Sequence, residues 1–90
     1  MSAAAVFRPR PDVRFRLVGY EAVIVRQLDA EVIAVNEVGA SILTLLDASR
    51  TVRDLIDALL EEYNVDRESI SKDVEQFLVE LREAGVVEEA

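Results

Sequence analysis

The chain has 90 residues, of which 51% are hydrophobic and 31% are charged, and its formal net charge is −8. A chain of this length folds as one domain with a modest core, and it holds no apolar run near the ~20 residues that a membrane span needs. It contains no histidine, cysteine or tryptophan, which excludes disulfides, Ser-His and Cys-His nucleophile pairs and the usual nitrogen and sulfur zinc ligands. We therefore expect no catalysis, metal or cofactor, and the lack of cysteine suits a cytoplasmic protein.

The charges are unevenly distributed along the chain. Residues 1–30 carry five arginines and three acidic side chains, a net charge of +2, whereas residues 31–90 carry five basic and fifteen acidic side chains, a net charge of −10. A nucleic-acid binder needs clustered lysine and arginine to displace counterions from phosphates. The acidic part of the chain would repel a duplex, so we expect no nucleic-acid partner.

The first twelve residues show no clear element. Met1–Val6 is small and apolar, but no basic residue precedes it and no long apolar stretch follows, so it is not typical of a signal peptide. Pro9 and Pro11 then interrupt an arginine-rich stretch, and proline is excluded from central strands because it lacks an amide donor. We expect residues 1–12 to be a flexible lead-in and residues 13–90 to form a single domain.

Three short strands are predicted next. Val13–Val18 alternates apolar side chains with arginines, which is the period-two pattern of a half-buried strand. Ala22–Val25 is rich in β-branched residues, and after a polar break at 27–30 the segment Val32–Val35 has the same character. These segments predict a small antiparallel meander, which needs helices packed on it to be stable.

Three helices follow, each with a recognisable start. Asn36, Thr51 and Asp66 are good N-cap residues, and Asp54 completes a weak form of the capping box with Thr51. Gly85 stands where a helix would end in a left-handed residue. Three strands followed by three helices indicate one α+β domain. The apolar stripe of the third predicted helix consists of Ile70, Val74, Phe77, Leu78, Leu81 and Ala84.

The junction between the strands and the helices carries a more specific pattern. Residues 35–47 (VNEVGASILTLLD) resemble the L-N-x-x-G/A-x-x-I-x-x-L-L-D-G segment of the PqqD family, and 50–52 (RTV) follow at the distance of that family's R-T-V helix start. Residues 73–85 resemble its D-V-x-x-F-L-x-x-L-x-x-x-G ending, so that the resemblance covers roughly residues 13–87. The two departures are Ala48 for the usual glycine and Val35 for the common leucine.

The resemblance implies a compact, winged helix-turn-helix-like domain that binds the leader of a ribosomally synthesised precursor peptide. In that family the leader adds as a strand to the exposed edge of the third strand, in a groove beside the third helix, and a modifying enzyme, often a radical-SAM maturase, then acts on the peptide. Added-strand docking uses the unpaired backbone groups of a free edge. The residues that this implies on the third strand are Val32, Ile33, Ala34 and Val35.

On the third helix the expected contacts are less direct. Val79 falls opposite the apolar stripe, next to Lys72, Glu75 and Arg82. If the groove follows that flank, these four residues contact the leader, with Lys72 and Arg82 meeting its acidic side chains. In an arbitrary domain, however, residues 32–35 would be ordinary sheet core and an isolated exposed valine would have no special meaning.

Two other functions stay open at this point. Three helices after a small sheet also fit a winged helix-turn-helix transcriptional regulator that reads DNA with its third helix. That helix would carry five acidic side chains against three basic ones, which makes it a poor recognition helix. The other open function is that of an acidic adaptor, which docks on a partner protein through its helices.

Overall fold

The structure is a computed structural model, and it describes residues 1–28, 30–46 and 49–90. It confirms the α+β class, because a three-stranded antiparallel sheet is followed by three helices. Asp47 and Ala48 of the family pattern lie outside the described residues. In chain order the elements are β1 (Phe7–Pro9), β2 (Val13–Val18), β3 (Glu21–Arg26), β4 (Glu31–Val35), α1 (Glu37–Leu45), α2 (Val52–Glu62), α3 (Arg67–Glu83) and β5 (Val87–Glu89).

The three predicted strands form one sheet in the order β2-β3-β4. A tight turn joins β2 to β3, and there Gly19 has a φ of +64°, in the left-handed region that glycine enters at no steric cost. The turn brings Val18 opposite Glu21, and the same antiparallel pairing continues to Val13 opposite Arg26. Because β3 lies in the centre, β2 and β4 are both edges of this sheet.

All three predicted helix caps are confirmed. The side chain of Asn36 accepts a hydrogen bond from the amide of Gly39 at 2.9 Å, which satisfies one of the unpaired donors of α1. Thr51 and Asp54 form the reciprocal capping box at the start of α2. Asp66 accepts a hydrogen bond from the backbone amide at position 69, in the first turn of α3. Each helix therefore begins directly after its predicted cap residue.

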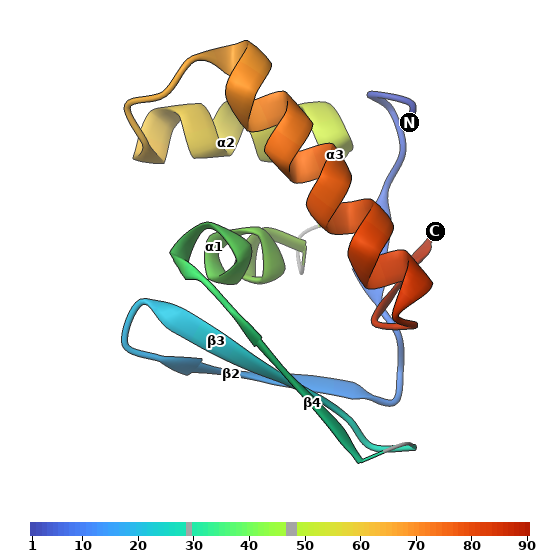
Figure 1. Cartoon of the computed structure of the whole chain (residues 1–90). Helices are drawn as coiled ribbons and strands as arrows, with labels where there is room; N and C mark the ends of the chain where they lie inside the picture. Colours follow the sequence, from blue (N-terminus) through green and yellow to red (C-terminus); the bar gives the residue numbers. More distant parts are fainter. Residues whose placement is uncertain (29, 47–48) are drawn as a thin grey trace.

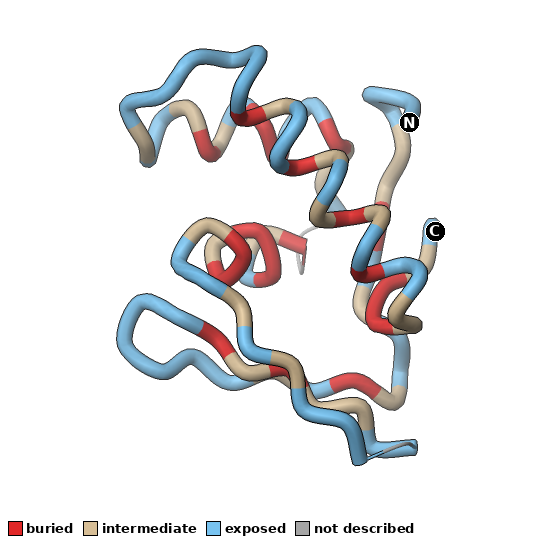
Figure 2. The backbone as a smooth tube through the Cα atoms, in the orientation of Figure 1, coloured by how far each residue is buried: buried red, intermediate tan, exposed pale blue. Residues whose placement is uncertain are grey.

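The layers follow from these elements. Helix α1 lies between the sheet and the pair of helices α2 and α3, which pack on each other (Figure 1). The buried hydrophobic residues of the three helices and of β3 belong to one core cluster. The β2–β3 turn and the whole of β4 are exposed or half-buried (Figure 2). None of the helices in the described part of the chain is long and apolar enough to cross a membrane. The largest fully buried side chains are Phe7, Ile24, Ile42, Leu43, Leu55, Leu59, Leu78, Val52, Val74, Val86 and Val87.

Two strands were not predicted, and they correct the expectation of a flexible lead-in. β1 and β5 pair antiparallel in a second sheet, and Phe7 of β1 is only 1% exposed. Pro9 is compatible with this strand because a strand in a two-stranded sheet is an edge. Further upstream, the backbone carbonyls of Ala3 and Ala5 accept the first amides of α2, at 3.0 and 2.9 Å. Much of the expected lead-in is therefore part of the packed domain.

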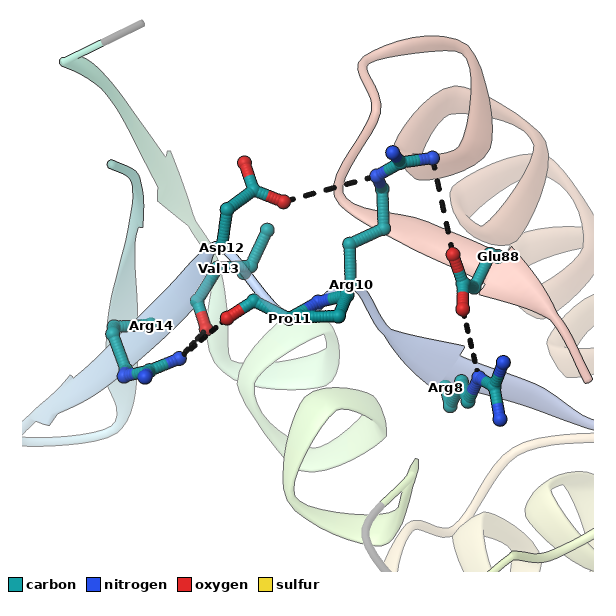
Figure 3. A network of polar contacts seen from close by, with 7 residues as sticks. All are labelled: Arg8, Arg10, Pro11, Asp12, Val13, Arg14 and Glu88. Carbon is teal, nitrogen blue, oxygen red and sulfur yellow. Dashed lines mark hydrogen bonds and ion pairs between the residues drawn. The ribbon is translucent and has the colours of Figure 1, made fainter. Parts of the chain in front are cut away.

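A chain of ion pairs ties the second sheet to the beginning of the first (Figure 3). The Nε atom of Arg8 lies 2.8 Å from Oε2 of Glu88, which stands directly opposite it in the β1–β5 register. The other carboxylate oxygen of Glu88 lies 3.9 Å from Nη1 of Arg10, and Nε of Arg10 lies 3.8 Å from Oδ1 of Asp12. These side chains are partly exposed, so the pairs contribute little stability each and mainly fix the register of the two ends.

Candidate functional site

The direction of the backbone groups in β4 follows from one hydrogen bond at the other side of the sheet. The amide of Gln27, just after β3, donates to the carbonyl of Asp12 at 3.0 Å, toward β2. In an antiparallel strand successive residues point their backbone groups to opposite sides, so the even-numbered residues of β3 point toward β4. Ile24 is such a residue, and it stands opposite Ile33. Ile33 therefore points its amide inward, toward β3.

Consequently, Val32 and Ala34 direct their amides and carbonyls away from the sheet. Both residues are exposed, and the side chain of Val32 adds apolar surface at 63% exposure. No proline and no bulge interrupts β4, so this edge keeps the donors and acceptors of a strand that lacks a neighbour. Such an edge is a template for pairing with another extended chain.

The opposite edge of the sheet is protected. The guanidinium of Arg14 folds back along β2, and its Nη1 atom donates to the carbonyls of Pro11 and Val13 at 3.0 and 2.9 Å (Figure 3). By the same alternation, Val13 points its carbonyl to the outer side of β2, so the arginine occupies an acceptor that an added strand would need. Arg14 and Arg16 also place positive charge along this edge, a common device against unwanted pairing. The structure thus leaves β4 as the edge that is suited to docking.

A hollow of about 350 Å³ adjoins this edge, between β4 and the C-terminal half of α3. Apolar side chains dominate its walls, while Asn36 and Glu80 supply the polar groups. Apolar walls with a few polar groups are typical of ligand-binding surfaces. The residues that line it are Ile33, Ala34, Val35, Asn36, Phe77, Glu80, Leu81 and Ala84.

A second hollow, of about 240 Å³, continues the first along α3 toward its N-terminus. The two share Asn36 and Phe77, and the second adds Asp73 as well as residues of α1. The absence of a side chain at Gly39 allows α1 to approach α3 and β4 closely, because a Cβ atom there would lie 3.0 Å from Cζ of Phe77 and 3.1 Å from Cβ of Val35. The half-buried Phe77 ring therefore lies where α1, β4 and α3 meet. We call the two hollows together the β4–α3 groove.

The α3 wall of the groove is acidic. Asp73 and Glu80 both line it, and Glu80 accepts a hydrogen bond from Nε2 of Gln76 at 3.1 Å. Within the described ranges 1–28, 30–46 and 49–90, neither carboxylate forms an ion pair. In the same ranges there is no group of three or more His, Cys, Asp or Glu side chains that could hold a metal ion.

The expected site residues divide into two sets. Those of β4 lie at the free edge, and Ile33, Ala34 and Val35 also line the groove. The four expected on α3 do not line either hollow. At 100° per residue two of them, Glu75 and Arg82, fall on the side of the helix opposite Phe77, and the other two lie on the flank about 80° to 100° from Glu80. These four residues are Lys72, Glu75, Val79 and Arg82.

This difference has a physical reason. The apolar stripe of α3 predicts buried side chains along its whole width, which leaves the opposite side of the helix for contacts with a ligand. In the structure the stripe is wider than the core: Val74 and Leu78 are fully buried, whereas Phe77 and Ala84 at its margin are half-buried. The margin of an apolar stripe, next to Glu80, was the signal that could have identified this wall.

Another hollow, of about 320 Å³, lies between the β2–β3 hairpin and α1. Leu17, Tyr20 and Ser41 are among its lining residues, and the hydroxyl of Ser41 lies 3.0 Å from that of Tyr63. It involves residues of α1 other than those that border the groove. Neither Val32 nor Ala34 borders it, so it lacks the open donors and acceptors of β4. The β4–α3 groove is the stronger candidate site.

Comparisons with known proteins identify the family of this chain. The family model for Coenzyme PQQ synthesis protein D (PqqD) matches residues 21–87. The solved structure of TbiB1 in complex with the TbiA(beta) leader peptide is 25% identical, with a TM-score of 0.84 over 90% of this chain and 94% of that chain. Lasso peptide synthetase B1 complexed with the leader peptide is 26% identical, with a TM-score of 0.81 over 91% of this chain and 96% of that chain. No curated protein matches. The motifs of the chain and its structural similarity to these two proteins agree with the family match. Because the family model matches residues 21–87, which is most of its length, the chain belongs to the PqqD family.

Proposed function

We propose that this protein binds the leader of a ribosomally synthesised precursor peptide at the edge of β4 and in the β4–α3 groove, and presents the peptide to a modifying enzyme. The observation that carries the proposal is the unprotected edge of β4 beside an apolar groove. Two solved structures with a similar fold are complexes with leader peptides, which supports a peptide as the occupant.

The free energy of such docking is the difference between favourable contacts and the cost of ordering the peptide. The outward amides and carbonyls of Val32 and Ala34 offer main-chain hydrogen bonds, each worth about 1 kcal/mol net. Alternate side chains of the added strand point toward the groove, where apolar anchors contribute through burial. These gains must offset the cost of ordering a flexible peptide. We expect an affinity near the micromolar range, on the order of −8 kcal/mol.

In this proposal the chain itself performs no chemistry. Without histidine or cysteine it cannot build the usual pairs of nucleophile and base. The modification is assigned to a separate enzyme of the class that the family resemblance implies, a radical-SAM maturase. Mixing the purified maturase encoded nearest to this gene with this protein and following co-elution on a sizing column tests that assignment.

Peptide docking is tested with proline, which removes one amide donor. Peptides of about 12 residues, selected from a displayed random library against the purified protein, serve as probes. We expect Ala34→Pro to stay folded and to weaken peptide binding about tenfold or more, because it loses an outward amide. Leu17→Pro is the matched control, since it removes an outward amide from the opposite edge, at an exposed position. It should bind the probes as the parent does.

Ile33→Pro completes the set. It removes a donor that points toward β3, so it should lower the melting temperature of the domain itself. Titration calorimetry with the probes and melting curves for all three variants provide the readouts. Equal peptide affinity for the parent and a folded Ala34→Pro protein would show that the edge of β4 is not the docking site.

A further inference from the structure

We propose that the groove selects a cationic leader peptide. In the docked strand, a lysine or arginine side chain binds the carboxylates of Asp73 and Glu80, and an apolar side chain packs on the ring of Phe77. This inference rests on the proposed function, because it specifies the chemistry of the segment that docks on β4. It reverses the charge expected from the sequence, in which Lys72 and Arg82 were to meet acidic residues of the leader.

The two carboxylates are placed to act on one extended segment. Asp73 and Glu80 are seven residues apart in α3, which separates them by about 10 Å along the helix axis. Around the axis they differ by only about 20°, so they lie on the same face of the helix. Phe77 lies between them, and its ring borders both hollows. A strand docked on β4 passes along this wall, so a cationic side chain on it can reach one carboxylate while its neighbours contact the ring.

Within the described ranges, none of the three cations of α3 forms an ion pair with Asp73 or Glu80. On α3, Arg67 pairs with Asp57 of α2, and the ammonium of Lys72 lies 3.6 Å from Glu68. The third cation of the helix, Arg82, falls on the side opposite the groove. Two carboxylates beside an apolar floor therefore keep a local negative potential, and a cationic side chain is the complementary partner.

The strand geometry adds a constraint on sequence. In an added strand, residues of one parity face the groove and those of the other parity face away. The apolar anchor and the cationic residue both face the groove, so they must stand an even number of positions apart. A peptide with the two at odd spacing would place one of them on the wrong side.

The test uses the displayed random library selected against the parent protein. We expect the selected peptides to be enriched in lysine and arginine over the unselected pool, at positions two or four residues from an aliphatic or aromatic residue. Binding of these peptides to the double variant Asp73→Asn/Glu80→Gln should be about three- to tenfold weaker than binding to the parent. The matched control Glu61→Gln/Glu75→Gln makes the same change in net charge away from the groove, and it should reduce affinity less than twofold.

The outcomes separate this inference from the function on which it rests. Peptides that depend on Ala34 but show no cationic bias, or that bind the Asp73→Asn/Glu80→Gln variant as tightly as the parent, would overturn the charge preference and leave edge docking intact. Equal losses in the two double variants would reduce the effect to net charge and also overturn it. Peptides that bind Ala34→Pro as well as the parent would overturn the edge docking itself.

Discussion

At the residue scale, the helix caps illustrate how one side chain sets both local structure and response to pH. Asp66 accepts hydrogen bonds from the backbone amide of Ser69 at 2.7 Å and from its hydroxyl at 3.0 Å. These bonds favour the charged carboxylate, and they lower its pKa below the ordinary value of 3.8. Because the folded state holds the proton less tightly than the unfolded chain does, the cap stabilises α3 above that value and loses its contribution as the pH falls through the lowered pKa.

The variant Asp66→Asn isolates this effect, since asparagine caps a helix about as well as aspartate but does not titrate. We expect the two proteins to unfold at similar urea concentrations near about pH 6. Toward about pH 3 the parent should lose stability faster than Asp66→Asn, because only the parent protonates its cap. The measurement is the difference between urea midpoints at each pH, which removes the titration of the other acidic groups that both proteins share. A constant difference across this range would show that Asp66 does not couple the helix to pH.

At the scale of elements, the sequence predicted what local patterns encode. The period-two alternation of Val13–Val18, the β-branched segments after it and the caps at Asn36, Thr51 and Asp66 all correspond to elements of the structure. These signals are local, because each depends on spacing within a few residues. The family resemblance implied an exposed edge on the third strand, and the structure places β4 at an edge of the sheet.

Elements that depend on distant partners could not be predicted in this way. β1 and β5 have three residues each and lie at opposite ends of the chain, so neither carries enough periodicity to stand out. The groove presents the same difficulty. Whether Phe77 is core or wall depends on how near α1 and β4 approach α3, and Gly39 permits that approach. Similarly, the hydrogen bond from Gln27 to Asp12 shows which residues of β4 point outward, and the sequence does not reveal this bond.

The β1–β5 pair makes a further prediction about stability. Phe7 is 1% exposed and joins the same core as the helices, so Phe7→Ala should reduce the free energy of unfolding by about 3–5 kcal/mol. That is a large share of the 5–15 kcal/mol typical of a folded domain. Its neighbour Arg8 is exposed and pairs with Glu88, so Arg8→Ala should cost less than about 1 kcal/mol. Urea unfolding of both variants measures the contrast, and similar small losses for both would mean that β1 contributes little to the domain.

At the scale of the whole molecule, charge and shape favour a peptide over a nucleic acid. Helix α3 would be the recognition helix of a winged helix-turn-helix protein, yet it carries five acidic and three basic side chains. Two of those carboxylates line the groove, and two of the three cations are engaged in ion pairs. The arginines of β2 lie on the edge of the sheet opposite β4.

We therefore expect no binding to duplex DNA at about 150 mM salt. Phosphate contacts gain their free energy by releasing counterions, which requires several clustered cations, whereas residues 31–90 have a net charge of −10. Fluorescence anisotropy with a labelled random duplex measures this, and the cationic library peptides serve as the positive control in the same buffer. The salt response separates the two modes: a peptide held by main-chain bonds and apolar anchors should lose only a few-fold in affinity over a fourfold rise in salt. Micromolar binding of the duplex, falling by orders of magnitude over that rise, would instead support the transcriptional regulator. It would place the functional surface on the arginines of β2 rather than on the edge of β4.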